Sequence, residues 1–175
     1  MSQTTGDVAA EDVKWEQSTL SELIDHIVNT HHAYLNKQMP IISELLTTLL
    51  RHHWFEHQEL LQAHTLFHQL KAELEQHMIK EETKGFVLIK AYEKEPGQQL
   101  ELVAKTINAH INEHDSAEKL LAKIREATNN YHIPSDVCDT YNFTFRKIQE
   151  MEKDLRQHIH LEDDILFPRM QALLK

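Results

Sequence analysis

Two similar stretches of this sequence place histidine and glutamate at a spacing suited to metal binding. Both read Gln-His-apolar-x-x-Glu-acidic-x-x-x-Phe, and they are residues 76–86 and 157–167. Positions four apart lie on one face of an α-helix, so His77 faces the same way as Glu81, and His158 the same way as Glu162. Two such faces turned toward each other would put two imidazoles and two carboxylates into one cavity. The stretches therefore predict a metal site, and one with room for two metals.

A weak internal repeat adds one lone histidine to each face. His32 and His114 are 82 positions apart, and His77 and His158 are 81 positions apart. The two parts of the chain thus look like two copies of one helical hairpin. In an antiparallel bundle, a pseudo-twofold axis would bring all six side chains to one level, where two carboxylates could bridge two metals.

The order of these residues narrows the kind of metal site. Ferritin-like di-iron bundles use Glu-x-x-His, and no histidine here has a glutamate three positions before it. A structural zinc site would favour several cysteines, and the chain has only Cys138. A mixed set of imidazoles and carboxylates suits iron, manganese or zinc.

The elements that must position these residues are predicted to be helices. Glycine (3) and proline (4) are scarce among the 175 residues, and apolar residues recur at helical spacing. We expect an all-α, antiparallel four-helix bundle over residues 18–175, after a loose polar tail over residues 1–17. Its helices are expected from Thr19 to a turn at residues 52–57, then over about 59–94, 98–128 and 135–174.

Three local signals refine these helices. Thr19 and Glu22 have the spacing of a capping box at the start of the first helix. Pro40 is expected to kink or restart that helix, and Pro168 to bend or end the last one. Cys138 is interpreted as a small residue at the start of a helix.

Charge and cysteine content exclude several classes of protein. The formal charge of −10 argues against binding to nucleic acid or to anionic membranes. No apolar run reaches the ~18 residues of a membrane span, and the polar, acidic N-terminus does not have the pattern of a secretion signal. One cysteine cannot form an internal disulfide framework, so a reducing, cytoplasmic location is expected.

The chain resembles the hemerythrin-like domain of the RIC family, the di-iron proteins named for repair of iron centres. The similarity covers about Leu20 to Pro168 and depends on several motifs that are specific only in combination. They are Glu22-Leu-Ile-Asp-His-Ile-Val, His32 with Pro40 eight residues later, His77-Met-x-Lys-Glu81-Glu, Glu113-His114-Asp115, Thr128-Asn-Asn with Pro134 and Cys138 beyond, and His158-Ile-x-Leu-Glu162 ending in Leu166-Phe167-Pro168.

This resemblance implies a non-haem centre of two iron ions, bridged by carboxylates, with an oxo bridge as a further option. Matched residue by residue, the histidine ligands are His32, His77, His114 and His158, and the bridging carboxylates are Glu81 and Glu162. The fifth histidine of the family falls on His53, with the adjacent His52 as the alternative.

Two departures from the family pattern stand out. The family usually carries a small N-terminal domain with a cysteine motif, where this chain has a polar stretch without cysteine, so cluster repair without that domain becomes an open question. The family often has Leu-Phe-Pro after its first His-x-x-x-Glu, where this chain has Gly85-Phe86-Val87. We expect the helix to continue there, with no effect on ligation.

The remaining acidic residues and histidines are assigned supporting or surface roles. Glu82 and Asp163 are expected in solvent, or holding a ligand histidine in one tautomer. Surface or supporting positions are also expected for His26, His31, His57, His64, His68, His110, His132 and His160.

Three functions are compatible with these observations. The leading one is a di-iron protein of nitrosative or oxidative stress that handles NO, O2 or peroxide, or donates iron to damaged iron-sulfur proteins; whether it turns over as an enzyme stays open. The alternative is a hemerythrin-like module that binds O2 or iron as a sensor or store without turnover. The third is an acidic helical bundle whose histidines bind metal adventitiously.

Overall fold

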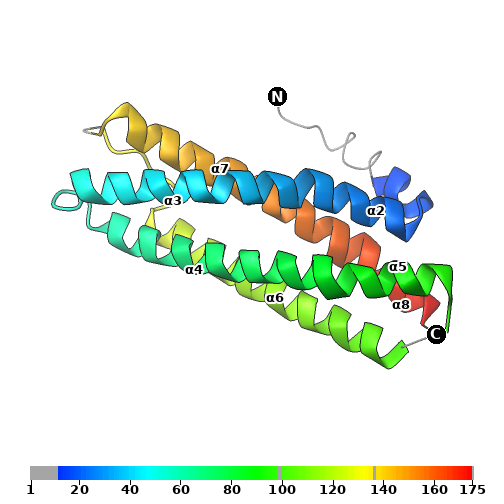
Figure 1. The fold of residues 1–175 in the computed structure, drawn as a ribbon. Coiled ribbons are helices and arrows are strands. Elements are labelled where there is room, and N and C mark those ends of the chain that lie inside the picture. The colour runs from blue at the N-terminus through cyan, green and yellow to red at the C-terminus, as the bar shows by residue number, and fades with distance from the viewer. Residues whose placement is uncertain (1–11, 98–99, 136, 175) are drawn as a thin grey trace.

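The computed structural model describes residues 12–97, 100–135 and 137–174, and their long helical rods run antiparallel (Figure 1). Three of the four rods are built from consecutive segments, some α-helical and some wound more widely as π-helix, and the other rod is one continuous α-helix. The first rod is α2 (Leu20–Ile27), η1 (Val28–His32) and α3 (Ala33–His53), and the second is α4 (Glu59–Lys80), η2 (Glu81–Gly85) and α5 (Phe86–Lys94). The third is α6 (Leu100–Ala127), and the fourth is α7 (Asp139–His160), η3 (Leu161–Leu166) and α8 (Phe167–Leu173).

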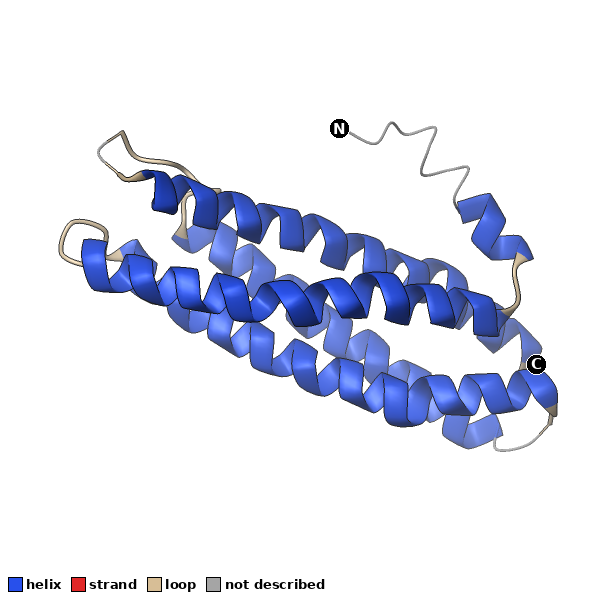
Figure 2. Ribbon diagram, turned by 45° about the horizontal axis from the view of Figure 1, so that its top comes forward, coloured by secondary structure: helices blue, strands red, loops and turns tan. Residues whose placement is uncertain are grey.

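These rods pack as a four-helix bundle, as predicted. The α3 helix packs on α4 and α7, and α4 packs on α6. Figure 2 shows that the regular structure of the described residues is entirely helical, with loops only at the two ends of the bundle. No helix in this described part of the chain is long and apolar enough to cross a membrane.

The start of the first rod follows the predicted capping box. The Thr19 hydroxyl accepts a hydrogen bond from the Glu22 backbone N–H at 3.1 Å, and the Glu22 carboxylate accepts one from the Thr19 N–H at 2.9 Å. The α7 helix begins at Asp139, with Cys138 at its N-cap, later than predicted. The start predicted at residue 135 or 136 is not observed, because Ser135 lies in a turn before the helix and residue 136 lies outside the described residues.

The interruptions of the helices are not where proline predicts them. Pro40 is exposed within an unbroken α3, and Pro168 lies in the first turn of α8, where a missing N–H costs little. Three rods instead contain the π-helical segments η1, η2 and η3. Single π turns are rare and often occur at functional sites.

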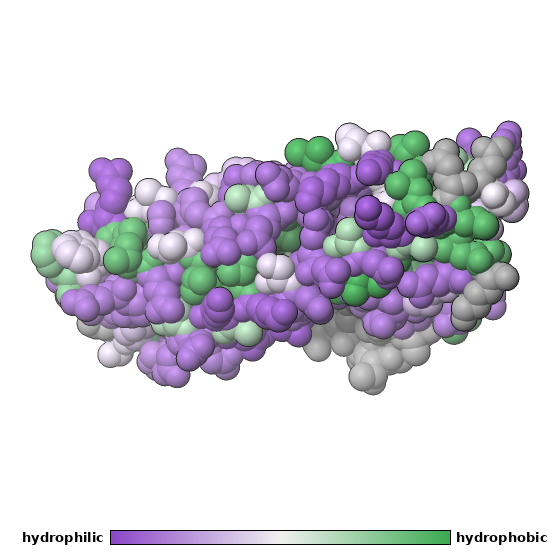
Figure 3. Space-filling view, turned by 90° about the horizontal axis from the view of Figure 1, so that it is seen from below, coloured by the Kyte–Doolittle hydropathy of each residue, from purple (hydrophilic) through white to green (hydrophobic). Residues whose placement is uncertain are grey.

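The apolar core of the bundle has two parts. One is built from α3, α4, α7 and the C-terminal part of α6, with Leu46, Phe67 and Phe145 among its fully buried side chains. The other is built from α2, α5, α8 and the N-terminal part of α6. Buried histidines and glutamates lie between these two parts, and the surface seen in Figure 3 is largely hydrophilic.

The polar segment before the bundle differs from the prediction in its described portion. Residues 12–17 are helical, and Trp15 is buried against α2, where its ring stacks on His26 at 4.3 Å between centroids. Arg169 donates hydrogen bonds to the backbone oxygens of Trp15 and Ser18. The aromatic ring thus anchors a segment that looks featureless by composition. Residues 1–11 lie outside the described residues.

Candidate metal centre

Six of the seven predicted site residues converge at one level of the bundle. They lie roughly a dozen residues from the same end of each rod, because the rods alternate in direction. All six are almost completely buried, each with at most 3 % of its surface exposed. They are His32, His77, Glu81, His114, His158 and Glu162.

The four histidines form two pairs through their Nε2 atoms. His32 and His158 approach to 3.2 Å, and we call this pair the first half-site. His77 and His114 approach to 3.0 Å, and we call them the second half-site. Two Nε2 atoms this close together can coordinate one cation between them.

The two carboxylates connect the half-sites. Glu81 has Oε2 at 3.3 Å from Nε2 of His32 and Oε1 at 3.2 Å from Nε2 of His77. Glu162 has Oε1 at 3.0 Å from Nε2 of His158 and Oε2 at 3.0 Å from Nε2 of His114. Each carboxylate thus has one oxygen in each half-site, which is the arrangement required to bridge two metals.

Several carboxylate oxygens of this cluster lack hydrogen-bond donors, as expected if they bind cations. Both oxygens of Glu81 and Oε2 of Glu162 are buried with no hydrogen bond from any described residue. Burial raises the pKa of Glu81 well above its usual range, and the nearby charge of Glu162 raises it further. Two carboxylates buried this close together repel each other, and a pair of divalent cations would balance them.

Carboxylates behind the imidazoles orient three of them. Nδ1 of His32 donates to Glu82, and Nδ1 of His114 donates to Asp163, both at 2.8 Å. These contacts agree with the supporting role considered for Glu82 and Asp163. A proton held on Nδ1 leaves the Nε2 lone pair free for a metal.

The third support was not recognised in the sequence. Nδ1 of His77 donates to Glu113 at 2.8 Å, and Lys80 in turn donates to Glu113 at 2.6 Å. Burial opposes ionisation of Glu113, but the hydrogen bonds from Lys80 and His77 lower its pKa. Glu113 therefore stays negatively charged behind the second half-site.

His53 does not reach this cluster, and its assignment as the fifth histidine is wrong. It is the last residue of α3, about 30 Å along the rod from His32 at 1.5 Å per residue. Its Nε2 lies 3.3 Å from Sγ of Cys138 at the far end of the bundle. The neighbouring His52 is exposed at that same end.

His110, and not His53, lies beside the second half-site. It is 4 % exposed, and its Nδ1 lies 3.7 Å from Glu81 and 3.8 Å from Glu113. Burial lowers its pKa to about 4, and the neighbouring His77 contributes, so the ring is neutral and able to donate a lone pair. The spacing of four between His110 and His114 is the signal that could have identified it.

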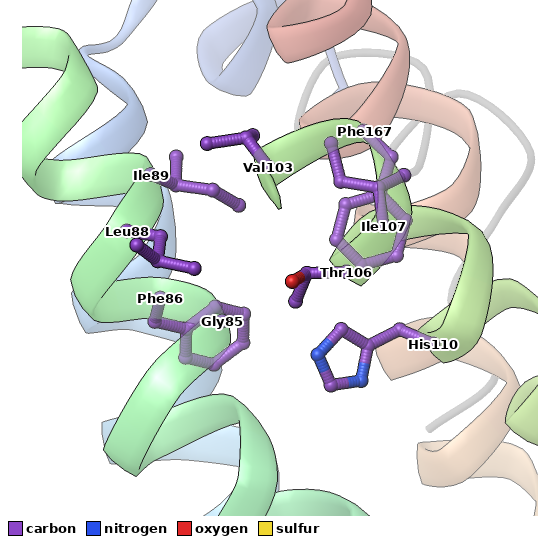
Figure 4. A pocket seen from close by; sticks show the side chains of 9 residues that line it. All are labelled: Gly85, Phe86, Leu88, Ile89, Val103, Thr106, Ile107, His110 and Phe167. Atoms are coloured by element: carbon purple, nitrogen blue, oxygen red, sulfur yellow. The ribbon is translucent and has the colours of Figure 1, made fainter. Parts of the chain in front are cut away.

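Gly85 is what lets His110 come so close. A Cβ at Gly85 would lie 2.7 Å from Nε2 of His110, shorter than any normal contact. Figure 4 shows the His110 ring at one end of an apolar crevice that is too narrow for water in this side-chain arrangement. The crevice is lined by Gly85, Phe86, Leu88, Ile89, Val103, Thr106, Ile107, His110 and Phe167.

A second, more polar opening reaches the other side of the second half-site. This groove of about 270 Å³ lies between α4 and α6 and is bordered by His77 and His114. Glu73, Lys80 and Glu113 also line it. The cluster therefore borders one open groove with charged side chains and one closed, apolar crevice.

Two other histidines are more buried than predicted. His31 is 5 % exposed and lies beside His158, and His57 is 8 % exposed at the far end of the bundle.

Comparison with protein families gives this geometry its context. The model described as "Hemerythrin HHE cation binding domain" matches residues 23–170. The chain belongs to the hemerythrin HHE family. The range of that match contains every residue of the two half-sites and both carboxylates that connect them. A cation-binding domain is therefore shown, in agreement with the buried donor set.

Curated relatives within this family are named as iron-sulfur cluster repair proteins. The chain is 35 % identical over 161 residues to YtfE of Citrobacter koseri, covering 90 % of this chain and 69 % of that protein. The values are the same for YtfE of Escherichia coli O157:H7. It is 25 % identical over 151 residues to ScdA of Staphylococcus epidermidis, covering 86 % and 66 %. These matches confirm the resemblance to the RIC family, and the chain spans about two-thirds of these relatives' length.

Proposed function

We propose that this chain holds two iron ions and acts in the repair of iron-sulfur proteins under nitrosative or oxidative stress. The observation that carries the proposal is that Glu81 and Glu162 each place one oxygen in each half-site. Single-metal sites do not require carboxylates placed in this way. The names of the curated relatives support iron over manganese or zinc.

The proposed histidine ligands are divided unevenly between the two irons. His32 and His158 would hold one iron through Nε2, and His77 and His114 the other, with His110 as a third histidine on the second iron. An iron pair held there would supply a redox couple and an open position for a small ligand. The chain's own contribution is to fix the donors, bury them from bulk water and keep the imidazoles in one tautomer.

The crevice and the groove differ in polarity, so each suits a different kind of small molecule or ion. The crevice of Figure 4 is apolar and closed to a water-sized molecule, so NO or O2 would enter through it only when the side chains that line it move apart. The groove beside His77 is lined by Glu73, Glu113 and Lys80; its carboxylates can attract a cation, and its polar groups can hydrogen-bond to peroxide. These features support both handling of a gas and donation of iron, and we propose damaged iron-sulfur proteins in the cytoplasm as the recipients.

One anaerobic experiment separates these roles. Iron-loaded, reduced protein is mixed with NO, with peroxide, or with a metal-free iron-sulfur protein plus inorganic sulfide and a thiol reductant. Consumption of NO or peroxide, or restored cluster absorbance, is then followed, with sulfide and reductant alone as the control. Repair predicts cluster recovery that stops when Glu162→Ala replaces the native chain. No consumption and no transfer from a fully loaded protein would contradict the proposal.

The alternative is a module that binds O2 or iron reversibly without turnover. The near-complete burial of the six site residues favours it, because exclusion of water protects a bound ligand from further reaction. Reversible O2 binding without net consumption of NO or peroxide would identify this alternative.

A further inference from the structure

The four histidines of the half-sites differ in what holds their outer nitrogen. Nδ1 of His32, His77 and His114 donates to a carboxylate at 2.8 Å in each case. Nδ1 of His158 is buried and has no hydrogen-bond acceptor among the described residues. The first half-site therefore has one supported imidazole, whereas the second has two.

The internal repeat shows what replaces the missing carboxylate. Glu113, which supports His77, is 82 positions after His31, the same offset that relates His114 to His32. His31 lies beside His158 with the two rings nearly parallel and 5.8 Å apart between centroids. It is 5 % exposed, and its own Nδ1 donates to Asp154 at 3.1 Å. A histidine directed at Asp154 thus stands where the other copy has a carboxylate directed at a ligand.

The chemical consequence is a difference in ligand strength. A carboxylate on Nδ1 makes an imidazole a better donor and fixes its orientation, and losing such a partner typically lowers metal affinity about 10- to 100-fold. The second half-site has two supported imidazoles and His110 nearby, so it offers the stronger set of donors.

We infer that the half-site of His32 and His158 binds its iron more weakly and is the one that releases it. This inference depends on the proposed two-iron centre and adds a direction to it. A chain built in this way donates one iron and keeps the other, and the retained iron holds Glu81 and Glu162 in place for reloading.

The test is an equilibrium titration of the metal-free protein with ferrous iron under anaerobic conditions, against a competing chelator of known affinity. The native chain is expected to bind two irons with affinities about 10- to 100-fold apart. His32→Ala is expected to abolish the weaker class and leave most of the stronger one. Glu113→Gln is expected to lower the iron affinity of the second half-site toward that of the first.

The decisive variant puts the missing carboxylate back. His31→Glu is made together with Asp154→Asn, so that the new carboxylate does not face Asp154, and Asp154→Asn alone is the control. The double variant is expected to tighten the weaker class about tenfold or more, with the control unchanged. Thermal unfolding followed by circular dichroism checks that each variant is folded.

The possible results distinguish failure of the unequal affinities from failure of the proposed two-iron centre. Two equal iron affinities in the native chain, or tightening of the stronger class by His31→Glu, would overturn the inference and leave the two-iron centre standing. A native chain that binds fewer than two irons would overturn both. If His31→Glu does not fold, Glu113→Gln still decides, because an effect on the weaker class alone contradicts the assignment.

Discussion

The two copies of the hairpin, Leu20–Lys94 and Leu100–Leu173, supply the same inner residues and differ behind them. Each gives two histidines and one glutamate to the cluster. At equivalent positions, however, Val28 corresponds to His110, His31 to Glu113, Gly85 to Leu166 and Pro40 to Ala122. The repeat keeps four histidines and both bridging carboxylates, and it changes the residues around them, including His110, the proposed third histidine of the second half-site. A near-symmetric centre can therefore hold two unequal irons.

The largest expected effect comes from the residues that both half-sites share. Glu162→Ala and Glu81→Ala should each reduce bound iron from two per chain to nearly none, because each removes one oxygen from both half-sites. His32→Ala should remove only one iron. Metal content by plasma emission after desalting checks this, and a Glu162→Ala chain that keeps one iron at native affinity would count against a bridging role.

The next comparison is between Gly85 and Leu166. Gly85→Ala should push the His110 ring away from Glu81, since the new Cβ would lie 2.7 Å from Nε2, and weaken the second half-site about tenfold. His110→Ala should show the same loss. As a control, Leu166→Ala should lower unfolding free energy by about 2–5 kcal/mol without selective loss from the second half-site. The iron titration separates these outcomes, and equal losses from both half-sites would disprove the role of Gly85.

Substitutions at Pro40 and Ala122 test the stability of the helical rods and not metal binding. Pro40 is exposed inside α3, so Pro40→Ala should restore a helical hydrogen bond and raise the unfolding free energy by about 1 kcal/mol. Ala122→Pro in the unbroken α6 should lower it by about 3 kcal/mol. Urea unfolding measures both changes, and a loss of stability in Pro40→Ala would show that the proline is needed to shape the first rod.

The smallest effect is expected at His53. His53→Ala should leave iron content and both affinities unchanged, because its ring contacts Cys138 and Tyr141 rather than the cluster. The same titration provides the check. Loss of an iron in this variant would show that His53 is a metal ligand after all, in contradiction to the structure.

Much of this site follows from spacing within the sequence. The faces of His77 with Glu81 and of His158 with Glu162, and the offset of His32 and His114, suffice to place six side chains at one level. The capping box at Thr19 is equally local. Such features can be predicted because they depend on periodicity along one helix.

Other features depend on packing between helices. Family order points to His53 as the fifth histidine, whereas the i,i+4 spacing to His114 points to His110. The support of His77 by Glu113 and the contact of His110 with Gly85 each join different rods. The π-helical segments η1, η2 and η3 have no sequence pattern that we could recognise.

The most direct test of the account is Mössbauer spectroscopy of the oxidised protein after loading with iron-57, together with the iron content per chain. Carboxylates shared between the half-sites predict two irons whose spins are coupled, giving a diamagnetic ground state. One iron per chain, or two irons that behave as isolated paramagnetic ions, would contradict the bridging role of Glu81 and Glu162.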